Sequence, residues 1–256
     1  MVTQAPHVDP THVLVLGQFD DTDPDHGALV SCHTAVLAAL DHATAVDVFL
    51  DADQIAGVAL GSIADIGESF ELVADGQYRG ELPDDAALLA QLLDVRRFEA
   101  IAAIEAIVLR CENTPLLVYR PADRSVELDD RRTDAPADIQ SELADAPVGL
   151  LRTEPLVQWR ADGHEYALAP PSVTVDDAAF DLSNLVSVSF DCDTHRIYLA
   201  WDASDTGFLG RLAAHVGPSR PTTLSFPNSA AFERVAQAFE RVADTLGVLA
   251  GDGSNR

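Results

Sequence analysis

The fold of the second half of the chain is decided by residues 229–246, which read SAAFERVAQAFERVADTL. Their apolar side chains recur at the spacing that places residues on one face of an α-helix. These side chains are Phe232, Val235, Ala236, Phe239, Val242, Ala243 and Leu246. Asn228 or Ser229 can cap the first turn, and Gly247 can close the last one. The pattern predicts a long amphipathic helix with one buried face.

Short runs rich in β-branched and aromatic residues precede this helix and predict strands. They cover residues 156–159, 166–168, 173–175, 186–190, 196–201 and 222–226. Turn-forming sequences such as Asp162-Gly163 and Gly217-Pro218 separate them. The second half therefore has a predicted order of several short strands followed by one long helix.

The first half has the same predicted order. Strands are expected at residues 13–16, 28–40, 45–50 and 70–73, although residues 35–40 also suit a helix. A helix is expected at residues 83–111, with a break near residues 94–97. Pro83 suits its first turn, and Asn113 followed by Pro115 marks its exit.

A short pattern links the two halves, because residues 58–66 (VALGSIADI) align with residues 180–188 (FDLSNLVSV). With the shared order of elements, it favours a tandem repeat of one small fold. We expect an α+β protein with two pleckstrin-homology-like domains, each a small antiparallel barrel closed by a C-terminal helix. The domains are expected at residues 1–120 and 148–256, and residues 121–147 are expected to form an acidic, solvated linker with a short helix near residues 137–143.

The charge of the chain indicates where it works. It has no lysine, and its 16 arginines face 42 acidic residues, which gives a formal net charge of -26. The acidic side chains repel one another unless molar salt screens their charges. The composition is therefore typical of a cytoplasmic protein of a salt-accumulating halophile. It argues against nucleic acid and anionic lipid as partners, since both need clustered cations.

The remaining bulk features agree with a cytoplasmic protein. Cys32, Cys111 and Cys192 are odd in number and far apart, so we expect reduced thiols that pack as small hydrophobes. Residues 1–10 do not read as a signal peptide, and no apolar stretch reaches the length of about 18 residues that a membrane span needs.

No specific catalytic motif is present, and the lack of lysine excludes a Schiff base or a lysine-bearing phosphate loop. Residues 20–26 (DDTDPDH) suit a solvated loop, with a weak cation site as the alternative. Asp191, Asp193 and His195 suit a hairpin turn, with metal ligands on one strand face as the alternative. Ser31 and His33 could form a nucleophile and its base, but chance adjacency explains them as well. We therefore assign no catalytic, cofactor-binding or metal residue.

Two tryptophans and two arginine pairs are the remaining candidates. Trp159 and Trp201 are expected to pack inside the second domain, with a position at an interface rim as the alternative. Arg96-Arg97 and Arg131-Arg132 are expected to close local ion pairs. Either pair could instead dock an acidic partner, because guanidinium groups bind carboxylates in a forked geometry.

Several stretches resemble the archaeal chemotaxis adaptor family CheF. Within residues 97–122, the Asn113-Thr114 turn, the Leu117-Val118 strand and the Pro121-Ala122 exit are similar to the pattern of that family. Residues 27–31 and 60–66 resemble strands of its first domain, and residues 180–188 resemble a strand of its second domain. The chain departs from the family where Tyr119-Arg120 precede the exit and Asp123-Arg124-Ser125 follow it.

The resemblance implies a cytoplasmic adaptor without enzymatic activity or cofactors. Family members connect the phosphorylated response regulator and other chemotaxis proteins to accessory proteins of the archaellum, the archaeal rotary motor. In molar salt, such an adaptor would depend on apolar anchors and short-range arginine contacts. The alternatives are a tandem pleckstrin-homology-like scaffold of another pathway, and a hydrolase using Asp and His residues around positions 191–195.

Overall fold

The computed structural model describes residues 6, 8–19, 24–51, 66–94, 101–202 and 220–252. The chain forms two compact units, one of Met1–Leu14 and Asp21–Asp145 and the other of Val15–Asp20 and Ala146–Arg256. Both are built mainly from antiparallel strands with a few helices, so the expected α+β class is confirmed. None of the helices in the described ranges combines the length and apolar character of a membrane span.

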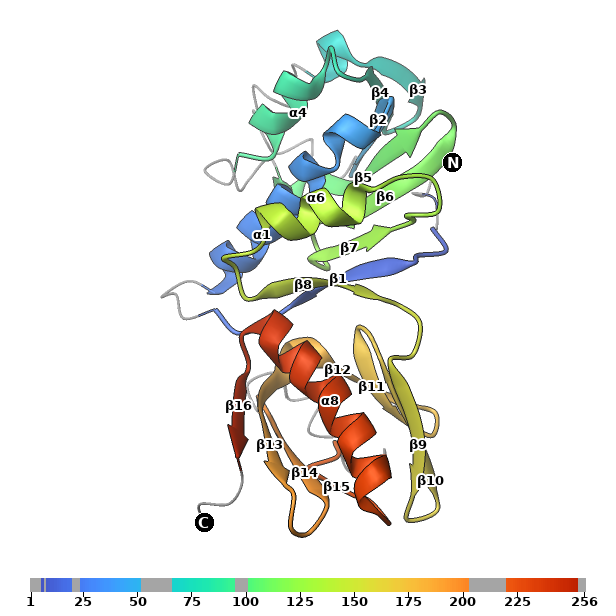
Figure 1. Ribbon diagram of the computed structural model, residues 1–256. Helices are drawn as coiled ribbons and strands as arrows, with labels where there is room; N and C mark the ends of the chain where they lie inside the picture. Colours follow the sequence, from blue (N-terminus) through green and yellow to red (C-terminus); the bar gives the residue numbers. More distant parts are fainter. Residues whose placement is uncertain are drawn as a thin grey trace. The chain divides into compact units, whose positions relative to one another are not determined.

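The first unit is one twisted antiparallel sheet with helices against it (Figure 1). Its strands follow the order β3-β4-β2-β5-β6-β7-β1. The elements are β1 (His12–Leu16), α1 (Pro24–Ala38), η1 (Leu40–His42), β2 (Ala45–Leu50), β3 (Glu71–Ala74), β4 (Gln77–Glu81), α4 (Ala86–Leu92), β5 (Ile104–Cys111), β6 (Thr114–Arg120), β7 (Ser125–Leu128) and α6 (Ala135–Glu142). Helices α1 and α6 pack on one another, and α1 also contacts β6 and β7.

The expected helix at residues 83–111 is confirmed in its first part and wrong in its last part. Helix α4 covers Ala86–Leu92, residues 95–100 lie outside the described residues, and Ile104–Cys111 is strand β5 at the centre of the sheet. Ile104, Ile107 and Val108 are buried with their neighbours on both faces of this strand. A strand covered on both sides shows no alternation, so its apolar run cannot be told from a buried helix by periodicity.

The expected strand at residues 28–40 is also wrong, because α1 occupies Pro24–Ala38, and the helical alternative for residues 35–40 is confirmed as far as Ala38. Pro24 opens the helix, where its missing N–H costs nothing. Ala28, Cys32, Ala35 and Val36 are buried and lie at helical spacing on its inner face. The outer face is apolar as well, which masks the helical period in the sequence.

Residues 121–147 do not form a solvated linker. They contain β7, which pairs with β6 and β1, and α6, which coincides with the short helix expected near residues 137–143. Val126 and Leu128 of β7 and Ile139 of α6 are buried. Acidic residues between these positions dominate the composition, so the segment resembled a linker although its few apolar side chains complete the first unit.

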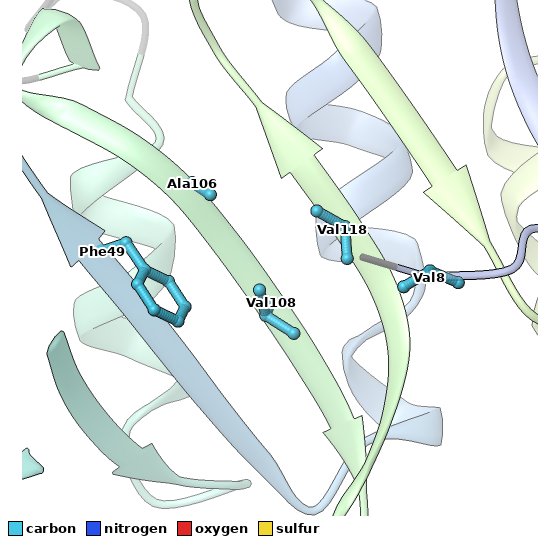
Figure 2. Close-up of a cluster of buried hydrophobic side chains, with 5 residues drawn as sticks. All are labelled: Val8, Phe49, Ala106, Val108 and Val118. Carbon is cyan, nitrogen blue, oxygen red and sulfur yellow. The ribbon is translucent and has the colours of Figure 1, made fainter. Parts of the chain in front are cut away.

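The sheet face away from α1 carries its own core cluster (Figure 2). Phe49, Ala106, Val108 and Val118 come from the neighbouring strands β2, β5 and β6, and Val8 joins them from the N-terminal segment. Burial of this cluster stabilises the three central strands at about 25 cal/mol per Å² of apolar area removed from water.

The second unit contains two four-stranded sheets and the long helix α8. Its elements are β8 (Val148–Arg152), β9 (Val157–Ala161), β10 (His164–Ala169), β11 (Ser172–Val175), β12 (Ala178–Asp181), η3 (Leu182–Asn184), β13 (Leu185–Asp191), β14 (Arg196–Trp201), β15 (Thr223–Ser225), α8 (Ser229–Leu246) and β16 (Leu249–Asp252). The sheet orders are β12-β11-β10-β9 and β15-β14-β13-β16, with β16 parallel to β13. The two sheets do not join into a closed barrel in the described part of the chain, so the barrel expectation is wrong there.

Helix α8 confirms the prediction for residues 229–246. The Asn228 side-chain oxygen accepts a hydrogen bond from the Ala231 N–H at 2.9 Å, and Gly247 closes the helix at φ 63°. Its apolar face contacts β8, β9, β13 and β16 (Figure 1). In the repeat pattern, residues 58–65 lie outside the described residues, whereas residues 180–188 span the end of β12, η3 and the start of β13.

Candidate partner-binding groove

An apolar groove lies between α1 and α4 in the first unit. It is open to solvent and has a volume of about 410 Å³. Its lining residues are Val30, His33, Thr34, Leu37, Ala90, Gln91, Leu93 and Asp94. Val30 and Leu37 lie two helical turns apart on α1, and each remains 37% exposed. The outward face of α1 thus presents these two apolar side chains beside the polar Thr34.

His33 is the buried polar residue of the groove wall, with 3% of its surface exposed. Its Nε2 lies 3.0 Å from the hydroxyl oxygen of Tyr119 on β6, and the two rings meet edge to face. Its Nδ1 is buried as well. Burial lowers the pKa of His33 to about 4, and a hydrogen bond with the Leu93 backbone raises it by a smaller amount. The imidazole is therefore neutral at neutral pH.

Cys32 sits beside this pair and is inert. It is fully buried, and its thiol donates a hydrogen bond to the Arg124 carbonyl oxygen at 3.5 Å. Burial raises the pKa of the thiol to about 12, although the Arg124 charge acts in the opposite direction. The thiolate needed for nucleophilic chemistry is thus absent at neutral pH, and Cys32 packs as the small hydrophobe that was expected.

Ser31 and His33 do not form a nucleophile and its base. The Ser31 hydroxyl donates to the Gly27 carbonyl oxygen of its own helix at 3.0 Å. Two residues along an α-helix point to nearly opposite sides, so Ser31 and His33 face away from one another. Ser31 and His33 are therefore close in the sequence without forming a common site.

Asp191, Asp193 and His195 lie in the hairpin turn between β13 and β14, as expected for a turn. The Asp191 carboxylate accepts hydrogen bonds from the backbone N–H groups of Asp193 at 3.1 Å and Thr194 at 3.0 Å. Hydrogen bonds from Thr194 are the main cause of the lowered pKa of Asp191. Within the described ranges, no three His, Cys, Asp or Glu side chains gather as metal ligands.

The acidic loop and the first arginine pair fall largely outside the described residues, which exclude residues 20–23 and 95–100. Asp25, at the end of that loop, forms an ion pair with Arg124 at 2.8 Å. Arg96 and Arg97 lie wholly outside the description, so their role stays a prediction.

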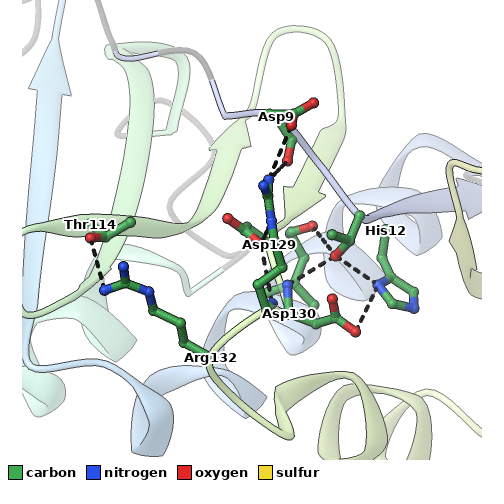
Figure 3. A network of polar contacts seen from close by, with 9 residues as sticks. Asp9, His12, Thr114, Asp129, Asp130 and Arg132 are labelled. Atoms are coloured by element: carbon green, nitrogen blue, oxygen red, sulfur yellow. Dashed lines mark hydrogen bonds and ion pairs between the residues drawn. The ribbon is translucent and has the colours of Figure 1, made fainter.

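The second arginine pair belongs to a local polar network (Figure 3). Arg131 Nε lies 2.8 Å from an Asp129 oxygen, and its Nη2 lies 3.2 Å from an Asp9 oxygen. Arg132 Nη1 donates to the Thr114 hydroxyl at 3.5 Å. For Arg131 the expected local ion pairs are confirmed, and they tie the N-terminal segment to the chain after β7.

A buried charge cluster was missed by the sequence reasoning. The Asp47 carboxylate on β2 is fully buried and lies 2.6 Å from both Arg79 Nε and Arg110 Nε, while Gln77 Nε2 donates to it at 3.1 Å. Burial alone would raise the pKa of Asp47, but the hydrogen bonds and charges of the two arginines outweigh it and lower the pKa. The available signal was one acidic residue inside the apolar run 45–50.

Trp159 packs in the core of the second unit, as expected. Its ring stacks on Tyr166 with centroids 5.2 Å apart and also lies near Phe226 and Phe239. Trp201 is half-buried, and its indole N–H donates to the Pro221 carbonyl oxygen at 2.7 Å. Both tryptophans therefore hold the second unit together.

Comparisons of the chain with family models, with curated proteins and with solved structures found no match. The function is therefore inferred from the residues and the geometry described above.

Proposed function

We propose that this protein is a non-enzymatic cytoplasmic adaptor of archaeal taxis signalling. In this role it links the phosphorylated response regulator and other chemotaxis proteins to accessory proteins of the archaellum. The resemblance of residues 27–31, 60–66, 97–122 and 180–188 to the family CheF supports the pathway. The observation that carries the binding role is the apolar groove beside α1, which leaves Val30 and Leu37 accessible.

The groove suits an amphipathic helix of a partner. In that mode of recognition, apolar side chains one or two turns apart enter a groove between elements of the receptor. Val30 and Leu37 have the matching two-turn spacing, and Leu93 closes the opposite side. Molar salt screens long-range attraction between charges, so such apolar contacts would supply most of the affinity in a halophile.

For the fold, we propose the pleckstrin-homology-like architecture for the second unit. Strands β9–β12 and β13–β15 form two antiparallel meanders, and α8 follows them along the chain and contacts both sheets. In the first unit, α1 and α4 interrupt the succession of strands, which is the reason to restrict the proposal to the second unit.

Signal transfer requires that one partner changes the affinity for the other. Phosphorylation of the response regulator would strengthen its binding to the adaptor. The bound regulator would then change the affinity of the adaptor for the archaellum accessory proteins, and the size of that change is the coupling free energy between the two binding sites. Interfaces in signalling are often small, so a single groove with two apolar anchors is a sufficient starting contact.

Capture from cell extract at molar KCl tests the proposal. Immobilised full-length protein is expected to retain the response regulator or archaellum accessory proteins, with more regulator retained after phosphorylation. Leu37→Asp should abolish this capture, because a carboxylate in the groove must be desolvated. Leu72→Asp is the matched control, since Leu72 is a 62% exposed leucine on β3. Recovery of proteins from another pathway alone would refute the taxis assignment, and equal loss of capture with both variants would refute the groove as the binding site.

A further inference from the structure

The last strand of the second unit is built from residues that disfavour strands. Strand β16 (Leu249–Asp252) reads LAGD, and alanine, glycine and aspartate are all depleted in strands. It pairs with β13 in parallel over four residues, and parallel pairing is slightly less stable per residue than antiparallel pairing. The strand conformation of β16 is therefore imposed by its neighbour β13 and held weakly.

Strand β16 covers the edge of a stronger strand. β13 reads LVSVSFD, seven residues rich in β-branched and aromatic side chains. The order of its sheet is β15-β14-β13-β16, so β16 is the outermost strand on this side (Figure 1). If β16 moved away, the backbone of Ser187–Phe190 would lose its pairing on that side. An uncovered strand edge of this kind is a template for pairing with another chain.

The chain just before β16 is anchored independently of it. Val248 is buried, and its N–H donates to the Ala243 carbonyl oxygen of α8 at 2.9 Å. Gly247 closes the helix in the left-handed region at φ 63°. Release of β16 therefore breaks its pairing with β13 and its contact with α8, and leaves the cap of α8 in place.

We propose that β16 is a releasable cover of β13, and that its release lets a second copy of the chain pair through the same edge. β13 complements itself when two copies are placed antiparallel about Ser189. Val188 then lies opposite Phe190, Ser187 lies opposite Asp191, and no like charges meet. The product is a dimer with two-fold symmetry, the commonest symmetry of homo-oligomers.

The charge distribution favours a second copy at this edge. Ser187–Phe190 contains no charged side chain, in a chain with a net charge of -26. Two copies can therefore meet along this stretch without opposing their carboxylates, while molar salt screens the remaining repulsion. The dimer depends on β13 and β16 alone, so it stands or falls separately from the taxis role and from the groove of the first unit.

Weakening β16 in the full-length protein tests the inference. Ala250→Pro/Gly251→Pro is the releasing variant, because successive N–H groups of a strand point to opposite sides and one of the two prolines must remove a donor facing β13. Light scattering after size-exclusion chromatography in molar KCl should show a monomer for the unmodified protein. The releasing variant should dimerise at a protein concentration about tenfold lower or less.

A disulfide locates the contact. Residues directly opposite in an antiparallel pair have Cα atoms about 4.5 or 5.5 Å apart, within the range that a disulfide spans. Ser189→Cys, combined with the two prolines and with Cys192→Ser to remove the exposed native thiol, should give a covalent dimer with copper phenanthroline. Ser225→Cys in the same background is the matched control, since Ser225 is a half-buried serine of β15 at the opposite edge of this sheet.

Hydrogen exchange of the unmodified protein keeps the test decisive if the releasing variant does not fold. The amides of Leu249–Asp252 should exchange about tenfold faster or more than those of β14, because a released strand exposes them. Protection of β16 equal to that of β14 would overturn the inference. A folded releasing variant that stays monomeric would also overturn it, even if that variant bound a strand of another protein. Equal crosslinking through Ser225→Cys would place the contact elsewhere and refute pairing through β13.

Discussion

Asp47 and Arg110 lie on the neighbouring strands β2 and β5, and the Arg110 Nε is 2.6 Å from the fully buried Asp47 carboxylate. Arg79 reaches the same carboxylate from β4 on the other side of β2. One acidic side chain thus joins three strands of the first unit through two guanidinium groups. Removal of the central charge would leave both arginines without their buried partner.

Asp47→Ala should destabilise the first unit by about 3 kcal/mol, because breaking a buried ion pair leaves uncompensated charge. Urea denaturation in molar KCl, followed by circular dichroism, measures the change in free energy of unfolding. Glu165→Ala removes an exposed partner of Arg160 on the second unit and should leave the stability nearly unchanged. Equal effects of the two substitutions would show that the Asp47 cluster has no special role.

His33 should make the protein less stable in acid. Its pKa in the folded state is about 4, against an ordinary value of 6.5, so the unfolded chain takes up a proton first as the pH falls. The stability that neutral His33 contributes is complete above about pH 6.5 and is lost progressively down to about pH 4. The stability difference between the unmodified protein and His33→Gln should change by about 3 kcal/mol across this range.

Urea denaturation at a series of pH values measures that difference. His164→Gln is the matched control, because His164 is an exposed histidine of β10 that pairs with Asp176. The explanation fails if the His33→Gln variant and the unmodified protein show parallel pH profiles between pH 6.5 and pH 4.

Gly247→Ala should destabilise the second unit by about 1 kcal/mol. Gly247 ends α8 in the left-handed region at φ 63°, where a Cβ atom is strained, and an added Cβ would also lie 3.3 Å from the Pro147 Cβ. Gly67→Ala provides the comparison, since an added Cβ at Gly67 would meet only the Tyr78 ring at an ordinary 3.9 Å. Melting temperatures in molar KCl measure the stability of both variants. If Gly67→Ala lowers the melting temperature as much as Gly247→Ala does, backbone strain is not the cause of the destabilisation.

Folding should depend on salt. The chain has a net charge of -26, so its acidic side chains repel one another. Salt weakens this repulsion, because the Debye length falls from about 10 Å at about 0.1 M salt to about 3 Å at about 1 M. The protein should therefore unfold or expand on dialysis to low salt and regain its circular dichroism spectrum when KCl is restored. Equal stability at about 0.1 M and about 1 M KCl would contradict the halophilic interpretation.

Several of the elements predicted correctly have a sequence pattern that reflects a single buried face. Helix α8 has apolar residues on one side and charged residues on the other, and its two caps are visible as Asn228 and Gly247. The hairpin of β13 and β14 was visible because Asp191 and its neighbours have the chemistry of a turn. In these cases, local preferences and burial point to the same structure.

The elements predicted wrongly are buried on more than one side. Strand β5 lies between β2 and β6 with both faces covered, and α1 has apolar residues all around it. Neither segment shows a period that distinguishes a helix from a strand. The groove between α1 and α4 could not be anticipated for this reason, because it requires α1 to be a helix.

The sequence by itself determined a formal net charge of -26, an α+β class and a long C-terminal amphipathic helix. These depend on local pattern and on sums over residues, which need no knowledge of contacts. Only the tertiary structure decided which residues share a site, namely Asp47 with its two arginines and His33 with Tyr119 and the groove. Such pairings join residues far apart in the chain, and their energies arise from burial that exists only after the sheet has formed.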